Sequence, residues 1–300
     1  MSTLTKGSNF PAELATKMFS LVQGHSSLAK MSGQKPIPFC GEDVFVFNFS
    51  SDISVVGESG AKPAGDATIT PVQIRPIKVV YQSRISDEFM YASEERRIEY
   101  LAEFADGFSR KIAAGLDKMA MHGINPATGS AASSTIGDNH FDHVITSSNT
   151  ITLGHDSSTL DTNIEEAIAK VEDAEFIVTG VAMAPAARTT MAGLTQNSGE
   201  RKYPDFAFGN YPSNLGGAIL DVNATVSANS SVDRVLVGDF ANSFKWGYSK
   251  NIPLEVIEYG DPDGAGHDLK QYNEVCLRSE AYIGWGILNP SAFAKVKASV

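Results

Sequence analysis

A long two-stranded ribbon is the feature that most limits how this chain can fold. Two runs rich in β-branched and aromatic residues, 43–57 and 67–86, predict a pair of strands joined by a turn. Pro71 and Pro76 fall inside the second run, and proline has no N–H to donate, so this strand lies at an edge or is bulged. An isolated two-stranded hairpin is at best marginally stable in water. The ribbon therefore needs a surface to lie on, either in its own domain or on another subunit.

The stretch between the two runs, GESGAKPAGD (57–66), combines three glycines with Lys62 and could suggest a phosphate-binding loop. A P-loop, however, requires Gly-Lys followed by Ser or Thr, and here Pro63 follows the lysine. Proline also lacks the N–H that a phosphate cradle uses, and no helix pattern begins after it. The stretch is therefore interpreted as the exposed tip of the ribbon.

The strongest helix signal covers residues 93–123. Ser93 is a suitable N-cap, and Gly123 is a suitable end. A helix over 94–122 would be about 43 Å long, which suits a rigid strut. Apolar residues recur along one face at helical spacing: Ile98, Leu101, Ala105, Phe108, Ile112, Leu116 and Met119.

The remaining segments mix helices and strands without a regular βαβ alternation, which favours an α+β fold. Residues 24–42 are expected to form an extended arm, and 289–298 a closing tail. Helices are predicted over 11–23, 160–174 and 186–194. Strands are predicted over 141–146, 176–185, 218–226, 234–240, 250–259 and 273–288.

The composition fits a folded protein and disfavours sequence-independent binding of nucleic acid. Hydrophobic residues make up 42% of the chain, and 35 acidic against 24 basic residues give a formal net charge of −11. Such a surface repels phosphate backbones, although it does not prevent the protein from enclosing nucleic acid. The two cysteines suggest no disulfide framework, and we see neither a signal peptide nor an apolar run of roughly 20 residues. These features predict a soluble protein that is cytoplasmic when made.

Two polar stretches carry possible metal ligands. GDNHFDHV (137–144) offers histidine and aspartate to zinc, but no third ligand at a definite spacing, so a solvated loop is favoured. GDPDGAGHD (260–268) lacks the EF-hand spacing, so a surface turn is favoured over weak calcium binding. No G-x-S-x-G, H-E-x-x-H or G-x-G-x-x-G motif is present. The sequence therefore predicts no catalytic residue, no cofactor and no metal.

The order of these elements resembles the major capsid protein of tailed bacteriophages, with the Hong Kong 97-type fold. The stretch VVGESGAKPAGDATITPVQIRPIKVVYQSRISDEFM is similar to the family's E-loop, and EERRIEYLAEFADGFSRKIAAGLDKMAMHG to its spine helix. The C-terminal pair RVLVGDFANSFKWGYSKNIPLEVIEY and YNEVCLRSEAYIGWGILNPSAFA is similar to the family's C-terminal pattern. The resemblance covers nearly the whole chain.

The resemblance implies an α+β fold with four parts. Residues 1–45 would form an N-terminal arm and 46–86 the E-loop ribbon. Residues 87–158 and 270–300 would form the P-domain, which contains the spine helix and the C-terminal strand. Residues 159–269 would form the A-domain.

The resemblance also implies a function. The chain would be a structural protein of the virion, not an enzyme, that self-assembles in the host cytoplasm as pentamers and hexamers into an icosahedral head around double-stranded DNA. Its partners would be its own copies, a separate scaffolding protein, a portal protein and a possible decoration protein, with no membrane and no sequence-specific DNA contact. The arm begins almost at once, which leaves no room for a fused scaffold; this implies a separate scaffolding protein or an N-terminal part that was removed, and Met1 favours the former.

Some residues can be singled out through the resemblance. The prototype joins its subunits by an isopeptide bond between a ribbon lysine and an asparagine, assisted by a glutamate; Lys62, Asn273 and Glu280 could match these, or could be ordinary surface residues. Candidate intersubunit contacts are Glu58, Lys62, Asp66, Arg75 and Lys78.

Two alternatives remain open from the sequence. An encapsulin-type compartment would share the fold but enclose protein cargo. A soluble enzyme with an unrecognised site would form a small defined oligomer and have a deep pocket.

Overall fold

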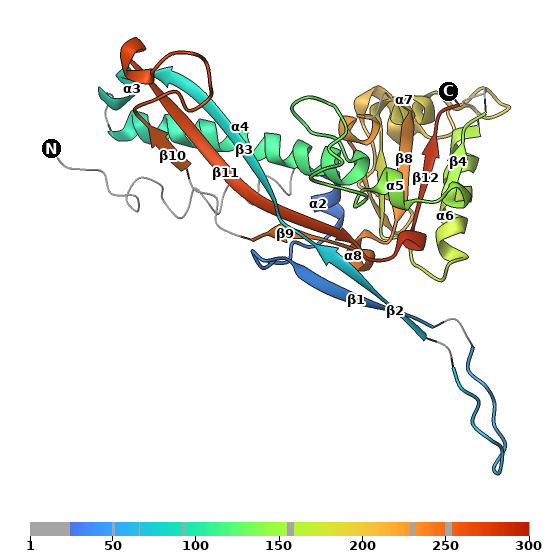
Figure 1. The fold of residues 1–300 in the computed structure, drawn as a ribbon. Helices are drawn as coiled ribbons and strands as arrows, with labels where there is room; N and C mark the ends of the chain where they lie inside the picture. Colours follow the sequence, from blue (N-terminus) through green and yellow to red (C-terminus); the bar gives the residue numbers. More distant parts are fainter. Residues whose placement is uncertain are drawn as a thin grey trace.

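The computed structural model describes residues 25–49, 52–65, 67–91, 94–154, 159–228, 232–249 and 254–299. Figure 1 shows a long sheet beside a long helix, a second sheet with its own helices, and a ribbon that projects away from both. The fold is mixed α+β, with the Hong Kong 97-like arrangement that the sequence predicts. The predicted helix 11–23 lies outside the described residues.

The ribbon consists of β1 (Glu42–Phe49) and β2 (Ala67–Ile74), which pair antiparallel from Glu42↔Ile74 to Phe49↔Ala67. Residues 52–65 continue beyond the paired part as an exposed extension (Figure 1). After a two-residue interruption that includes Pro76, the chain runs on as β3 (Ile77–Ser86). The prediction of a two-stranded ribbon with an edge strand is confirmed for β2. The prediction of one strand over 67–86 was wrong, because Arg75 and Pro76 interrupt it and β3 pairs with β11 in the long sheet.

The long sheet has the order β10-β11-β3, with β9 also paired to β11. Its centre is β11 (Glu274–Ile287), which pairs with β3 from Glu274↔Ser86 to Ile283↔Ile77. The strands β10 (Leu254–Ile257) and β9 (Phe244–Tyr248) pair with the opposite side of β11.

The long helix α4 (Glu94–His122) runs beside β3 and β11 (Figure 1). It follows the short helix α3 (Glu88–Tyr91) and ends at Gly123, whose φ of +64° suits glycine. The predicted stripe is buried except at its start, where Ile98 is 47% exposed. The first turns of α4 therefore cover little of the core.

The second sheet has the order β4-β12-β8-β5-β7-β6. Both of its faces are buried, each against a different hydrophobic cluster. Along β8, Val235 and Val237 pack in the cluster that contains α6 and α7, whereas Leu236 packs in the cluster that contains α4. This alternation is the period of two expected of a strand. The strands are β4 (Thr150–Thr152), β5 (Gly180–Met183), β6 (Asn214–Leu215), β7 (Ala218–Val222), β8 (Asp233–Gly238) and β12 (Phe293–Lys297).

Shorter elements complete the fold. The α-helices are α2 (Ser27–Met31), α5 (Phe141–Val144), α6 (Leu160–Glu172), α7 (Pro185–Gly193) and α8 (Phe240–Ser243). The 3-10 helices are η1 (Ser147–Asn149), η3 (Pro204–Gly209), η4 (Ala224–Ser227), η5 (Leu269–Tyr272) and η6 (Pro290–Ala292).

Three local predictions were wrong. Residues 141–144 form the helix α5 rather than a strand, because Phe141 enters the core beside Phe293. The predicted tail contains β12, a buried inner strand paired with both β4 and β8. The predicted arm contains α2, a helix whose N-terminus is capped by Ser26.

The two sheets exchange strands along the chain. β9 and β10 lie within 159–269 but pair with β11, and β12 lies within 270–300 but pairs with β8. The division into an arm, a ribbon, a P-domain and an A-domain stays a proposal. These pairings place strands of the proposed P-domain and A-domain in shared sheets.

After α2 the chain lies against β9. The Lys35 amide donates to the Trp246 carbonyl at 2.9 Å, and the Ile37 amide to the Tyr248 carbonyl at 3.3 Å. Gly247 lies between these contacts, and a Cβ at this position would stand 1.8 Å from the Lys35 carbonyl oxygen. The close approach of the two segments therefore requires glycine at 247.

We expect Gly247→Ala to separate residues 33–38 from β9 and to destabilise the subunit by on the order of 1–3 kcal/mol, because backbone atoms must move. Hydrogen exchange should show faster exchange of the Lys35 and Ile37 amides. Gly193→Ala is the control, because a Cβ there meets nothing within 4 Å. Unchanged exchange at Lys35 and Ile37 in Gly247→Ala would contradict the prediction.

Candidate functional site

The ribbon carries large apolar side chains that nothing in the described part of the chain covers. Phe45 and Phe47 of β1 are 61% and 58% exposed, and Ile69, the partner of Phe47, is 55% exposed. In the extension beyond the strands, Ile53 and Val55 are essentially fully exposed. Uncovered apolar surface of this kind marks a protein contact, so the ribbon is a candidate subunit interface.

An open, mostly apolar groove of about 690 Å³ runs along β3, on the side where β3 faces α4. Five consecutive residues of β3, 77–81, line one side. Phe108, Ile112 and Met119 of α4 and residues of the loop 125–136 also line it. Two lysines complete the lining: Lys111, and Lys78, whose ammonium is paired with the Glu280 carboxylate.

The predicted contact residues are spread along the ribbon and its base. Glu58 and Lys62 lie exposed in the extension, and Asp66 lies outside the described residues. Arg75 lies between β2 and β3, where its guanidinium donates to the Gln73 side chain at 2.8 Å. Lys78 is on β3, with its ammonium 2.9 Å from the Glu280 carboxylate. Their role as intersubunit contacts stays a prediction.

The residues proposed for a crosslink do not form one site within the subunit. Lys62 is in the ribbon extension, Asn273 is an exposed residue just before β11, and Glu280 is within β11. Seven residues of extended chain span roughly 23 Å, so Asn273 and Glu280 of the same copy lie too far apart to act together. The crosslink stays a prediction, and it would need these two residues from different subunits.

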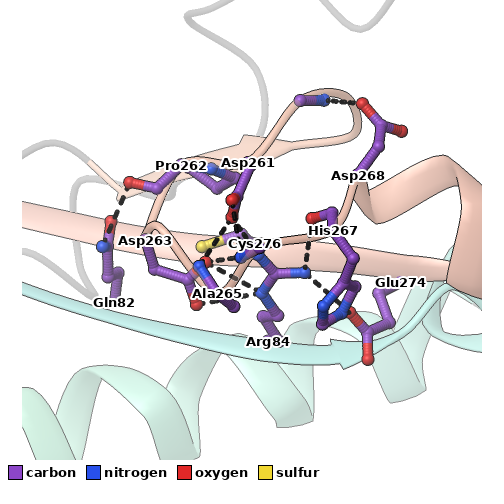
Figure 2. Close-up of polar contacts among 12 residues, drawn as sticks. Gln82, Arg84, Asp261, Pro262, Asp263, Ala265, His267, Asp268, Glu274 and Cys276 are labelled. Atoms are coloured by element: carbon purple, nitrogen blue, oxygen red, sulfur yellow. Dashed lines mark hydrogen bonds and ion pairs between the residues drawn. The ribbon is translucent and has the colours of Figure 1, made fainter.

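At the far end of the long sheet, the loop after β10 folds around Arg84 of β3 (Figure 2). The guanidinium contacts the carboxylates of Asp261, Asp263 and Glu274. Asp261 also accepts from the backbone amides of Ala265 and Gly266 at 2.9 and 2.8 Å, which fixes the turn. The hydrogen bonds from Arg84 lower the pKa of Asp263 to about 2 and also lower the pKa of Glu274.

The loop 260–268 is therefore a surface turn, as favoured, and two of its acidic residues, Asp261 and Asp263, contact the Arg84 guanidinium. Sequence reasoning did not find Arg84, because it lies about 180 residues before the carboxylates that it binds.

A buried polar cluster joins the end of α4 to the second sheet. His122 Nδ1 lies 2.8 Å from an oxygen of Asp142, and His122 Nε2 lies 2.9 Å from the Thr225 carbonyl. The Lys295 ammonium is 2.6 Å from the other Asp142 oxygen and 3.7 Å from Asp233. The preference for a solvated loop at 137–144 was wrong, because Asp142 belongs to this cluster and Phe141 to the core.

Burial and pairing oppose each other in this cluster. Burial favours neutral His122, but its hydrogen bonds with Asp142 and the Thr225 carbonyl, together with the charges of Asp142 and Asp233, outweigh burial and raise the pKa of the imidazole. Burial also opposes ionisation of Asp142, yet its hydrogen bonds and Lys295 lower its pKa. Burial and the neighbouring Asp142 raise the pKa of Asp233 to about 6.

His122, Asp142 and Asp233 present ligand atoms within 4.8 Å of one another, a spacing that a metal ion could use. The Lys295 ammonium already lies between the two carboxylates and supplies their counter-charge. We therefore assign no metal to this cluster.

A second buried group, Asp117 of α4, holds α2 in place. Its carboxylate accepts from the backbone amides of Ser27 and Leu28 at 3.0 and 3.2 Å, and from the hydroxyls of Ser26 and Thr225. The Asp117 side chain thus satisfies the free amides at the start of α2. Burial raises the pKa of Asp117 to about 6, against the lowering effect of these hydrogen bonds.

Sequence reasoning missed Asp117, although one signal was present. Ala113 and Ala120 lie one turn before and after it, and both are fully buried. Small residues on that side of a helix allow another segment to approach closely.

No helix within the described ranges is long and apolar enough to cross a membrane.

The sequence matches the model of the phage capsid family over residues 7–298. No curated protein matches it.

Several solved structures share the fold. A protein of Mycobacterium phage Ogopogo is 32% identical with a TM-score of 0.75, and the match covers 92% of each chain. A protein of Gordonia phage Cozz is 24% identical with a TM-score of 0.75, and the match covers 92% of this chain and 87% of that one. A capsid structure of a native GTA particle is 13% identical with a TM-score of 0.65, and the match covers 100% of this chain and 95% of that one.

Proposed function

The chain belongs to the phage capsid family, and from that premise we propose that it assembles as pentamers and hexamers into an icosahedral head that encloses double-stranded DNA. Membership makes it a capsid protein of the virion, a structural shell protein and not an enzyme. The geometry of assembly and the enclosed DNA are the proposed part.

The uncovered ribbon is the observation that carries this proposal. Phe45, Phe47 and Ile69 expose apolar surface on an arm that projects away from the body of its own subunit (Figure 1). A two-stranded arm of this kind is stabilised when a neighbouring copy covers it. A net charge of −11 also suits a shell that encloses DNA without binding it tightly.

We also propose partners that the subunit itself does not contain: a separate scaffolding protein, a portal protein and, on the outer surface, a decoration protein. Assembly would take place in the host cytoplasm.

Electron microscopy of the full chain, expressed with and without the neighbouring genes of its phage, tests the proposal. Closed shells or capsomer rings with fivefold and sixfold symmetry are the expected products, and filled heads should protect double-stranded DNA from nuclease. A persistent monomer or dimer under all conditions would contradict the proposal. Shells that retain protein cargo instead of DNA would favour a compartment.

The crosslink has its own test. If Lys62 of one copy bonds to Asn273 of another, shells boiled in denaturant should run as covalent ladders, and Lys62→Arg should remove them. Monomers alone from mature wild-type shells would end the crosslink hypothesis.

A further inference from the structure

Lys295 is the only lysine that is buried within the described ranges, with 9% of its surface exposed. It lies in β12 between two partner strands, opposite Thr150 of β4 and Leu236 of β8, so the sheet fixes its backbone on both sides. An ammonium group in such a place is costly unless other groups compensate its charge. The groups around its amine therefore determine what Lys295 does.

Two carboxyl groups and an imidazole surround this amine. Nζ lies 2.6 Å from Oδ1 of Asp142 and 3.7 Å from Oδ2 of Asp233. Oδ2 of Asp142 lies 2.8 Å from His122 Nδ1, on the oxygen where negative charge would develop if the amine attacked this carboxyl group. Burial and Asp142 raise the pKa of Asp233 to about 6, so this second carboxyl group can accept and return a proton near neutral pH.

Packing holds the segments that carry these groups together. Phe141, which precedes Asp142 in α5, packs on Phe293 of β12 with ring centroids 4.8 Å apart. His122 and Asp233 are 7% and 6% exposed, so little water reaches the amine. Reacting groups that are well oriented in such a site reach effective concentrations of about 10⁵–10⁸ M.

We propose that Lys295 and Asp142 of the same copy condense into an isopeptide bond, with Asp233 as the group that carries the proton. This bond differs from the Lys62 crosslink considered above, because it forms within one subunit and needs neither a neighbour nor a shell. It would join α5 to β12 across 153 residues of sequence. A covalent tie of this length restricts the unfolded chain and thereby stabilises the folded one.

The step balances without an oxidant or a cofactor. The Asp233 carboxylate takes one proton from the Lys295 ammonium, and the neutral amine attacks Cγ of Asp142. His122 donates to Oδ2 while this oxygen carries the negative charge of the adduct. Oδ1 then receives the proton held by Asp233 and a second proton from the nitrogen, and it leaves as water. One C–N bond forms, one C–O bond breaks, and an ammonium and a carboxylate become an amide and a water molecule.

The mass of the full-chain subunit, measured by mass spectrometry under denaturing conditions, tests the proposal. Wild-type protein should be lighter than its sequence by one water molecule. Trypsin should then release residues 119–170 joined to 279–297, because a linked Lys295 is no longer cleaved. Wild-type protein of full sequence mass, with 279–295 released as a separate peptide, would show a permanent ion pair and overturn the proposal.

The peptide map also separates the bond from another source of the same mass loss. Aspartate followed by glycine can lose water by closing to a succinimide, and the chain has two such sites, Asp106-Gly107 and Asp263-Gly264. A loss of water located in either of these peptides, with 279–295 released separately, would likewise overturn the proposal.

Two variants test the assigned roles. Lys295→Arg keeps the positive charge but cannot form the bond, and Asp233→Asn keeps the shape but cannot accept the proton, so both should have their full sequence mass. Lys202→Arg is the matched control, because Lys202 forms a more exposed ion pair with Asp161, and it should still lack one water. A joined peptide pair from Lys295→Arg or Asp233→Asn would overturn the assignment. If these variants do not fold, the wild-type mass and peptide map decide alone.

Discussion

Deletion of residues 58–65 is expected to prevent shell formation while leaving the subunit folded. All eight residues are exposed, and the one backbone hydrogen bond found among them, from the Gly60 amide to the Gly57 carbonyl, is local to the turn. Their removal therefore takes nothing from the core, but it shortens the arm that we propose reaches the next subunit. The yield of shells should fall by roughly tenfold or more. Electron microscopy measures the shells, and urea unfolding measures the subunit.

An eight-residue Gly-Ser replacement of 58–65 is the matched control for this deletion. It keeps the length of the arm and removes Lys62 and Glu58. Recovery of shells would show that this stretch contributes reach, whereas continued failure would show that its side chains make contacts. A large loss of subunit stability on deletion would mean instead that the ribbon tip belongs to the core.

The largest effect on the subunit itself is expected from Asp117→Ala. This change leaves the Ser27 and Leu28 amides and the Ser26 and Thr225 hydroxyls without their acceptor in a buried site. Each unsatisfied buried donor costs about 1–3 kcal/mol, and the two backbone amides cannot turn towards another acceptor, so a loss of roughly 2–6 kcal/mol is expected. Urea unfolding should show it, and hydrogen exchange should show the release of α2.

The partly exposed Asp106→Ala is the control, on the same helix. Asp106 forms only a surface ion pair with Arg110 at 3.0 Å, so its loss should cost no more than about 0.5 kcal/mol. Equal effects from the two substitutions would contradict the assigned role of Asp117.

The pH dependence of Asp117→Ala gives a further readout. The folded pKa of Asp117, about 6, lies above its ordinary value of 3.8, so its contribution to stability is full below pH 3.8 and is lost as the pH rises through 6. The stability gap between wild type and Asp117→Ala should therefore be wider at pH 4 than at pH 8, by up to about 3 kcal/mol. A gap that does not depend on pH would show that Asp117 titrates normally.

The sequence predicted those features that repeat a local pattern. The stripe from Leu101 to Met119 identified α4, and Gly123 marked its end, because helical spacing and a glycine stop are encoded within a few residues. The prolines at 71 and 76 likewise indicated an edge or bulged strand, and β2 is an edge strand of the two-stranded ribbon.

The polar clusters could not be predicted in this way. Asp117 meets Ser26 and Thr225 from positions 91 and 108 residues away. His122 likewise meets Asp233, and Asp142 meets Lys295 from 153 residues away. Such contacts depend on how the helix and the second sheet pack, and no spacing within one segment encodes them. The strand β12 was missed for the same reason, since its pairing partners lie far earlier in the chain.

The continuity of β2 and β3 has a mechanical consequence. The second arm of the ribbon runs into the long sheet with only Arg75 and Pro76 between the two strands. Tension applied by a neighbour at the ribbon would therefore pull β3 along its own axis against β11. The antiparallel ladder from Ile77↔Ile283 to Ser86↔Glu274 lies across that direction, so its hydrogen bonds would resist together in shear rather than open one at a time. If a shell expanded, the β3–β11 ladder of each subunit would resist the pull in shear, the direction in which all its hydrogen bonds share the load.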